Sequence, residues 1–181
     1  RDGGAVHLED FAQVFGVYPE TKYEKASYRN IAEVLWVETG EVGVAEFIRR
    51  LVFNVMIGNG DMHLKNWSLI YPDRRHAALA PGYDFVSTIA YLPDTRMALT
   101  LGRSKEMTEL SLDQLSYLAA KARLPEKLVL DAARETTAGF LSIWRAGEFN
   151  SGVDSKVGTK VVDSINDLLG KIRLVRECGG N

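Results

Sequence analysis

A short polar stretch near residue 60 holds the residue types that a phosphoryl-transfer site needs. Asp61 and Asn66 stand five positions apart on it, and Asp84 follows Asn66 by eighteen residues. One aspartate can accept the proton of an attacking hydroxyl, whereas a second aspartate and an asparagine offer the hard oxygen ligands that Mg²⁺ prefers. The three side chains therefore predict Mg²⁺-dependent phosphoryl transfer, provided that the fold brings them into one small volume.

The spacing of these residues is the one that protein kinases use. The kinase catalytic loop, H-R-D-x-x-x-x-N, places its aspartate five residues before a metal-binding asparagine, and the aspartate of a later D-F-G turn is the second metal ligand. Asp61 and Asn66 have the first spacing, and Tyr83-Asp84-Phe85 would stand in the place of the second turn.

A helix is expected to lead into this polar stretch. Apolar residues from Val44 to Met56 recur at intervals of three and four, which is the pattern of a helix with one buried face. Gly58-Asn59-Gly60 follows directly, and glycines of this kind end helices. The polar residues that come next are therefore predicted to lie on a loop at the end of a buried helix.

A β-hairpin is expected to follow the loop. Segments 67–71 and 76–80 predict two strands, and residues 72–75 between them predict a four-residue connection. A hairpin returns the chain to its starting point, so Asp84 can fold back beside Asn66.

The rest of the chain is predicted to be helical. We expect the fold to be mainly α, with the small hairpin carrying the catalytic and metal-binding loops, and we expect an internal loop at 150–160. The further predicted helices cover residues 7–15, 27–38, 111–121 (opened by a capping-box pattern at Ser111), 125–144 and an apolar seam from Val161 to Val175.

Composition excludes several classes of protein. The 181 residues suffice for one domain, and 22 Lys and Arg against 24 Asp and Glu argue against a nucleic-acid binder that relies on bulk positive charge. The single cysteine, Cys178, cannot form an intrachain disulfide. No apolar run approaches the ~20 residues that span a bilayer, and no signal peptide is visible. We expect a cytoplasmic protein without membrane contact, and we interpret the start at Arg1 as a cut or processed end.

The polar stretch and three other segments resemble one family. Residues 57–68 (IGNGDMHLKNWS) look like the catalytic loop of HipA-type serine/threonine kinases, the toxins of bacterial toxin–antitoxin pairs. Residues 8–13 (LEDFAQ) and 22–24 (KYE) resemble the start of that family's C-terminal lobe, and 81–84 (PGYD) resembles its metal-binding turn. The resemblance runs along essentially the whole chain and implies that residues 1–181 are the C-terminal lobe of a protein-kinase-like fold.

The resemblance also implies a role for each residue of the site. Asp61 would be the catalytic aspartate, ATP the phosphoryl donor, and Asn66 and Asp84 the ligands of Mg²⁺. Lys65 would offset negative charge on the γ-phosphate, because a lysine acts there as a point charge. The ATP-binding residues that the resemblance implies are His63, Leu64, Lys65, Asn66, Tyr83 and Asp84.

The partners that the resemblance implies are those of the toxin family. The protein substrate would be phosphorylated on serine and would be a tRNA synthetase or another translation component. An antitoxin of the HipB type would bind the protein, and DNA would be contacted only through that antitoxin.

The sequence lacks the parts of such a kinase that cover the nucleotide. Gly58-Asn59-Gly60 is followed by His63 where G-x-G-x-x-G requires a third glycine, and no strand-borne V-A-x-K precedes the catalytic loop. The N-lobe serine whose autophosphorylation inactivates the family has no counterpart either. We therefore expect weak or no kinase activity from the chain alone. The alternative is a non-catalytic or split-off lobe that binds an antitoxin or a separate N-lobe chain.

Two other interpretations stay open, and a third, a phosphatase, is disfavoured by its sequence context. Asp61, His63 and Asn66 can form a polar loop that merely closes the hairpin, and His63 can serve as a structural hydrogen-bonding residue as well as a phosphate neighbour. Asp-x-His also opens the metal site of calcineurin-like phosphatases. Those enzymes place the motif after a strand, however, and need later G-D-x-x-D and G-N-H-[DE] blocks that the sequence lacks. A zinc site is not expected, because His7 and His76 have no ligand spacing with His63.

Overall fold

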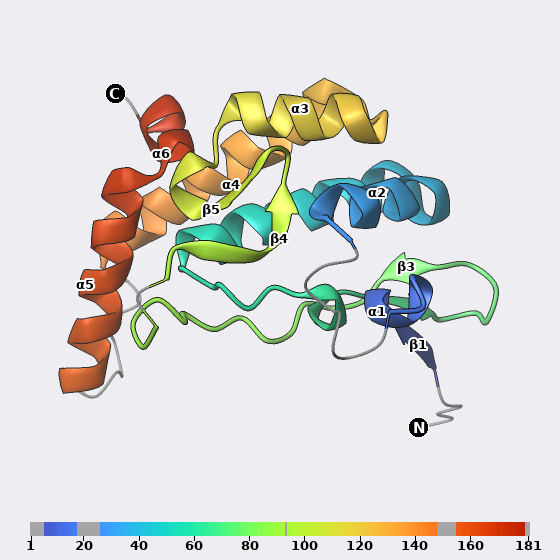
Figure 1. Ribbon diagram of the computed structural model, residues 1–181, viewed down its shortest axis with the longest axis horizontal. Coiled ribbons are helices and arrows are strands. Elements are labelled where there is room, and N and C mark those ends of the chain that lie inside the picture. The colour runs from blue at the N-terminus through green and yellow to red at the C-terminus, as the bar shows by residue number, and fades with distance from the viewer. Residues whose placement is uncertain (1–5, 18–25, 93, 148–154, 180–181) are drawn as a thin grey trace.

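The computed structural model describes residues 6–17, 26–92, 94–147 and 155–179, and it is mainly helical with two small sheets (Figure 1). The predicted fold class is confirmed. In chain order the elements are β1 (His7–Asp10), α1 (Phe11–Val14), α2 (Tyr28–Met56), the 3-10 helix η2 (Leu64–Asn66), β2 (Ser68–Tyr71), β3 (Ala78–Leu79), β4 (Arg96–Leu101), β5 (Ser104–Glu106), the 3-10 helix η3 (Met107–Glu109), α3 (Leu112–Ala122), α4 (Glu126–Ala146), α5 (Ser155–Lys171) and α6 (Arg173–Cys178).

Helix α2 runs through the middle of the molecule. Helices α3 and α4 lie on one side of it, whereas β3 and the loops that follow α2 lie on the other (Figure 1). The helices predicted at 27–38 and 44–56 are the two arms of α2, which bends at Gly40. The φ of 62° and ψ of −151° at Gly40 lie outside the helical region, and only glycine reaches such values without steric cost.

The predicted helix at 7–15 is wrong for its first half. His7–Asp10 is the strand β1, which pairs antiparallel with β2. The Asp10 side chain accepts a hydrogen bond from the Gln13 N–H, and the Gln13 side chain accepts one from the Asp10 N–H, both at 2.9 Å. This capping box starts helix α1 at Phe11 and leaves the preceding residues to pair with β2.

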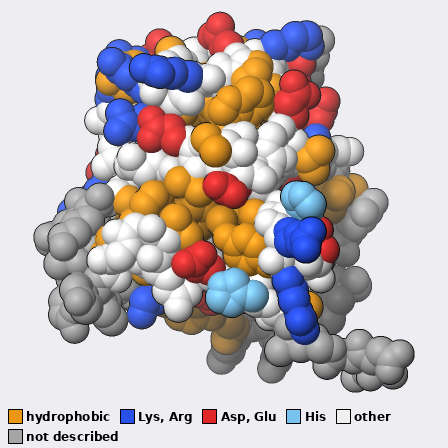
Figure 2. All heavy atoms as spheres, turned by 90° about the vertical axis from the view of Figure 1, so that its right-hand side faces the viewer, with side chains coloured by type: hydrophobic (Ala, Val, Ile, Leu, Met, Phe, Trp, Pro, Cys, Tyr) orange, Lys and Arg blue, Asp and Glu red, His pale blue; other side chains and the backbone are white. Residues whose placement is uncertain are grey.

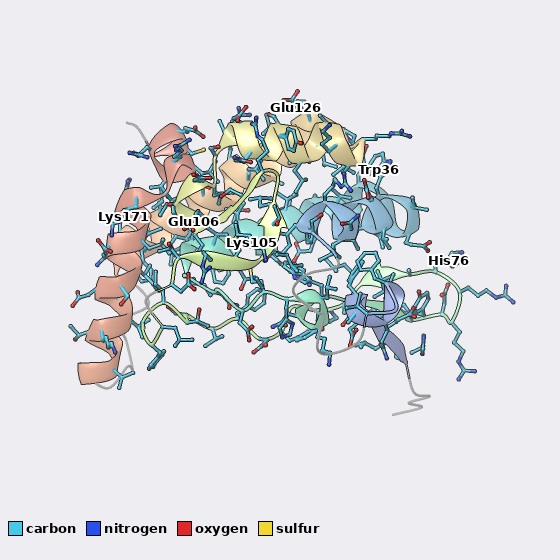
Figure 3. The ribbon with its side chains drawn as sticks, in the orientation of Figure 1. Trp36, His76, Lys105, Glu106, Glu126 and Lys171 are labelled. Atoms are coloured by element: carbon cyan, nitrogen blue, oxygen red, sulfur yellow. The ribbon has the colours of Figure 1, made fainter. Side chains whose placement is uncertain are left out.

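The predicted hairpin is confirmed, with shorter strands than expected. Strands β2 and β3 pair antiparallel in a register that places Leu69 opposite Leu79. The Asp73 carboxylate accepts hydrogen bonds from the N–H groups of Arg75 (2.9 Å) and His76 (2.8 Å). These bonds hold His76 in the connection instead of a strand, and it projects from the outer loop of the hairpin (Figure 3).

A second hairpin, β4–β5, was not predicted. Its register places Arg96 opposite Glu106 and Leu101 opposite Ser104, and Gly102 turns the chain with a φ of 57°. Strand β4 is buried on both faces over much of its length, so it lacks the alternation of polar and apolar residues that indicates a strand.

The predicted helices at 111–121 and 125–144 correspond to α3 and α4. The Ser111 hydroxyl accepts from the Gln114 N–H at 3.3 Å, so Ser111 is the N-cap of α3 as its sequence pattern indicates. Pro125 stands one position before the first residue of α4, Glu126.

The seam from Val161 to Val175 falls on two helices instead of one. Ile172 has extended backbone angles (φ −64°, ψ 126°) and separates α5 from α6. The predicted loop at 150–160 is wrong for residues 155–160, which belong to α5, and residues 150–154 lie outside the described residues.

Aromatic side chains from several elements meet beneath the loop that follows α2. Trp67, next to Asn66, packs edge-on against Phe47 of α2 with ring centroids 4.8 Å apart, and Tyr28 lies 6.3 Å away. All three are buried. The polar loop therefore rests on a close-packed part of the core, which resists movement of the residues above it.

The surface carries both apolar and charged areas. Figure 2 shows the end of the molecule that lies on the right in Figure 1, where apolar side chains occupy the middle of the face and charged side chains stand around them. Within the described ranges, no helix has the length and apolar character needed to cross a bilayer.

Candidate active site

The hairpin brings Asn66 and Asp84 together, as their spacing predicts. Asn66 is the last residue of η2, and its Nδ2 donates a hydrogen bond to Oδ2 of Asp84. Asp84 has a φ of 61°, in the left-handed region that aspartate tolerates better than most residues. A distance of eighteen residues along the chain thus becomes a direct contact between the two side chains.

The oxygen of the same carboxamide is available for a ligand. Oδ1 of Asn66 is buried and accepts no hydrogen bond from the protein. A buried amide oxygen without a partner is costly unless something else binds it. Together with the Asp84 carboxylate it forms a pair of hard oxygen donors, which is the donor type that fits Mg²⁺.

Two protein ligands are consistent with how Mg²⁺ binds beside nucleotides. Among the described residues, no group of three or more His, Cys, Asp or Glu side chains could hold a metal ion. Mg²⁺ in phosphoryl-transfer sites is held by one or two carboxylates, and water and substrate phosphates complete its shell. The donor set of Asn66 and Asp84 therefore suits a metal that arrives with a nucleotide.

Tyr83 fastens the turn that carries Asp84 to the loop that carries Asn66. The Tyr83 hydroxyl donates its proton to the Lys65 carbonyl oxygen at 2.6 Å. The Ser68 hydroxyl lies 2.6 Å from the Tyr83 oxygen and must therefore be the donor in that second hydrogen bond. Burial raises the pKa of Tyr83, and the hydroxyl keeps the proton that the bond to Lys65 requires.

Asn59 links the two loops through its side chain. Its Oδ1 accepts from the Asp61 N–H at 3.0 Å, and its Nδ2 donates to the Asp84 carbonyl oxygen at 3.1 Å and to Oδ1 of Asn54 at 2.8 Å. The spacing that singles out Asp61, Asn66 and Asp84 assigns no role to Asn59. The only sequence signal for it is its place as a polar residue between two glycines at the end of a buried helix.

Helix α2 also holds the segment that leads to Asp84. Arg50 donates from Nη1 to the Ala80 carbonyl oxygen at 2.5 Å and from Nε to Oε1 of Glu46 at 2.7 Å. The end of β3 is thereby attached to a rigid element, which fixes where the following turn begins.

The other predicted site residues differ in how accessible they are. The side chains of Asp61 and Lys65 are exposed on the loop, whereas His63 is buried and Leu64 is a fully buried core residue. Leu64 can therefore offer only its backbone to a ligand. The Tyr28 hydroxyl donates to the Met62 carbonyl oxygen at 3.0 Å and supports this loop from below.

Comparison with known proteins shows which family the chain belongs to. The family model of the HipA-like C-terminal domain matches residues 1–144. The chain belongs to the HipA-like C-terminal domain family. This HipA-like chain is 55% identical over 175 residues, or 96% of its length, to the kinase-like protein Y4dM of Sinorhizobium fredii. It is 34% identical over 131 residues, or 68% of its length, to the kinase-like protein Y4mE of the same organism.

A solved structure has the same fold. It is HipA of the Shewanella oneidensis MR-1 toxin–antitoxin system, in a complex with HipB and operator DNA. The match has a TM-score of 0.76 over 95% of the HipA-like chain, at 19% sequence identity. The HipA-like chain spans less than half of each of these proteins: 42% of Y4dM, 31% of Y4mE and 45% of the Shewanella chain.

The HipA-like chain places the Asn66–Asp84 pair at a narrow cavity between α2 and the turn after β3. The exposed Asp61 side chain does not line this cavity and stands on the loop beside it. The cavity is lined by Arg50, Asn54, Asn59, Met62, Asn66, Trp67, Gly82, Tyr83, Asp84 and Phe85.

Proposed function

We propose that this HipA-like chain carries the catalytic residues of an ATP-dependent protein serine/threonine kinase. The observation that carries the proposal is the contact between Asn66 and Asp84, with the free oxygen of Asn66 beside it. Family membership and the kinase-like relatives support the same activity. The motif follows helix α2, not a strand, which disfavours the phosphatase interpretation.

Asp61 is proposed to act on the substrate hydroxyl. Its carboxylate is exposed, so a serine or threonine of another protein can reach it and hydrogen-bond to it. A positioned carboxylate of this kind orients the hydroxyl and accepts its proton as the bond to phosphorus forms. Hydrogen bonds from Tyr28 to the Met62 carbonyl oxygen and from the Asp61 N–H to Asn59 hold the backbone that carries this carboxylate.

The remaining residues are proposed to hold the nucleotide. Oδ1 of Asn66 and the Asp84 carboxylate would hold Mg²⁺. When bound, this ion would neutralise negative charge on the phosphates. The Lys65 ammonium, exposed on the loop, is proposed to offset further charge on the γ-phosphate. Contacts with ATP are also proposed for Tyr83, His63 and the Leu64 backbone.

The partners proposed for the protein follow from its relatives. The Shewanella HipA structure contains HipB and operator DNA. We propose an antitoxin of the HipB type for this protein, with DNA contacted through the antitoxin and not by this chain. The proposed substrate is a protein, such as a tRNA synthetase or another translation component, and the proposed location is the cytoplasm.

A second candidate function is a lobe without activity of its own. Residues 1–181 contain neither a G-x-G-x-x-G loop nor a strand-borne V-A-x-K before the catalytic loop. Such a lobe would bind an antitoxin or a separate nucleotide-covering chain. A calorimetric titration of the 181-residue chain with Mg-ATP separates the candidates, since measurable affinity indicates a retained nucleotide site.

The kinase proposal is tested by transfer of ³²P from [γ-³²P]ATP to protein by the full-length gene product. Asp61→Asn and Asp84→Asn are each expected to lower the rate by about 100-fold or more, the usual scale for loss of such a group. Asp113→Asn, at an exposed carboxylate on α3, serves as the matched control and should leave the rate unchanged. Undiminished transfer in either site variant contradicts the assignment. Robust turnover by the 181-residue chain alone contradicts the expectation that it needs a further lobe.

A further inference from the structure

The Asn59 side chain is placed to set the positions of both aspartates of the site. It is 1% exposed, and it makes three hydrogen bonds with three different parts of the chain. Both of its N–H donors are used, one on Asn54 and one on the Asp84 carbonyl, and its oxygen accepts from the Asp61 N–H. A carboxamide has two donors and an acceptor oxygen, so no other side chain of this size could make the same set of bonds.

The anchor of this arrangement is helix α2. Nδ2 of Asn54 donates to the Arg50 carbonyl oxygen at 2.9 Å, and the Asn54 carbonyl oxygen accepts from the Asn59 N–H at 2.9 Å. Asn54 is itself buried. The Asn54–Asn59 pair therefore transmits the position of a rigid helix to two loops, and fully satisfied buried networks of this kind hold one geometry.

The two bonds to the loops fall where they constrain the aspartates most. The bond from the Asp61 N–H fixes the peptide plane before Asp61, and the bond to the Asp84 carbonyl fixes the plane after Asp84. Asp84 is in the left-handed conformation, which the bond at its carbonyl helps to keep. Because Mg²⁺ demands near-ideal octahedral geometry, small shifts of Asp84 weaken its binding.

We infer that Asn59 is a positioning residue that holds Asp61 and Asp84 in the relation needed for metal-nucleotide binding. The inference rests on the proposed kinase function for its metal readout. It adds a residue to which the family resemblance assigned no role, and it assigns that residue an effect on metal affinity beyond an effect on folding.

Thr88 provides a matched control because it joins the same two segments at different atoms. Its hydroxyl accepts from the Gly60 N–H at 2.8 Å and donates to the Gly58 carbonyl oxygen at 3.1 Å. Neither bond involves Asp61 or Asp84. Thr88→Val keeps the side-chain shape and removes a link between the loops without releasing either aspartate.

The experiment compares Asn59→Ala with Thr88→Val in the full-length protein. For each variant, thermal stability is measured, together with the affinity for Mn²⁺ by electron paramagnetic resonance and the affinity for Mg-ATP by calorimetry. Asn59→Ala is expected to weaken metal and Mg-ATP binding at least 10-fold, whereas Thr88→Val changes them less than 2-fold at a similar loss of thermal stability. Equal weakening by both variants, or unchanged affinity in folded Asn59→Ala, overturns the inference.

Two further measurements keep the outcomes distinct. If Asn59→Ala does not fold, Asn59→Ser, which keeps an acceptor near the Asp61 N–H, is measured in the same way. Failure of both to fold beside a folded Thr88→Val assigns Asn59 to stability alone and overturns the inference. If the unmodified protein binds no metal, the proposed function fails. Amide hydrogen exchange then tests the positioning itself, since Asn59→Ala should speed exchange at Asp61 and Thr88→Val should not.

Discussion

The Asn66 carboxamide gives its N–H to the Asp84 carboxylate and keeps its buried oxygen without a protein partner. A hydrogen bond of this kind orients both groups at once. The amide oxygen and the carboxylate are thereby neighbouring oxygen donors, one of them without a partner in the protein. The contact fits two interpretations. The two residues form a metal site, or they form only a structural link between η2 and the turn after β3.

Replacing Asn66 with aspartate separates these two possibilities. Asn66→Asp removes the donor and places two carboxylates together, and their mutual repulsion destabilises the fold by up to about 1 kcal/mol, the scale of exposed ion pairs. Mg²⁺ should restore the thermal midpoint of the variant, and calorimetric scans with and without Mg²⁺ measure this.

The control for this prediction exchanges the two residues. Asn66→Asp combined with Asp84→Asn restores one amide beside one carboxylate, and asparagine tolerates the left-handed backbone at position 84. The double variant should recover most of the stability in the absence of Mg²⁺. A single variant that is insensitive to Mg²⁺ speaks for a purely structural contact.

Removal of the Tyr28 hydroxyl should weaken the loop that carries Asp61. Tyr28 is completely buried and donates to the Met62 carbonyl oxygen, so Tyr28→Phe leaves that oxygen unsatisfied at a cost of about 1–3 kcal/mol. Urea denaturation at pH 7 measures the loss. A cost below a few tenths of a kcal/mol would mean that the bond contributes nothing to the fold.

The same variant should change how stability depends on alkaline pH. Burial raises the pKa of Tyr28 well above its ordinary value of 10.0, and the negative charge of Asp61 raises it further. The contribution of the neutral phenol is therefore fully present below pH 10 and is lost as pH rises above that value. Unfolding free energies between pH 8 and about 11 should fall more steeply in the unmodified protein than in Tyr28→Phe.

The bend in α2 should require glycine at position 40 because of the backbone angles there and not because of crowding by neighbouring side chains. No atom lies within 4 Å of the position that a Cβ would take at Gly40, so Gly40→Ala meets no steric obstruction from neighbours. The φ of 62° and ψ of −151° still oppose the substitution, at about 1–3 kcal/mol. Gly139→Ala, on α4 with equally open space and no positive φ, should instead stabilise the protein by about 0.5–1 kcal/mol. Chemical denaturation of both variants gives the comparison, and a neutral Gly40→Ala would show that the bend can relax.

The grouping of the central site residues was predictable because the sequence pattern that indicates it spans a short stretch of the chain. Asp61 and Asn66 share one loop, and only a hairpin was needed to return Asp84 to them. The hairpin was readable from residues 67–71 and 76–80, and the structure confirms it along with the contact between Asn66 and Asp84. The catalytic and ATP-binding roles of these residues stay predictions.

The features that were missed depend on contacts between distant segments. Strand β1 forms by pairing with β2, whose residues lie about sixty positions later in the chain, although the residues of β1 favour a helix. The role of Asn59 arises from its bond to Asp84, and the break at Ile172 arises where Leu174 donates its N–H to the Leu110 carbonyl oxygen at 2.8 Å. Local patterns carry no trace of such partners, so tertiary contacts decided these elements.

Trp67 has a place in this arrangement that an experimenter can use. It is almost completely buried, it follows Asn66 in the chain, and it lines the same cavity as Asp84. Trp36 and Trp144 are partly exposed, and neither lines that cavity. The indole at position 67 is therefore an intrinsic fluorophore beside Asn66 and Asp84, and its emission can report filling of the cavity without any attached label.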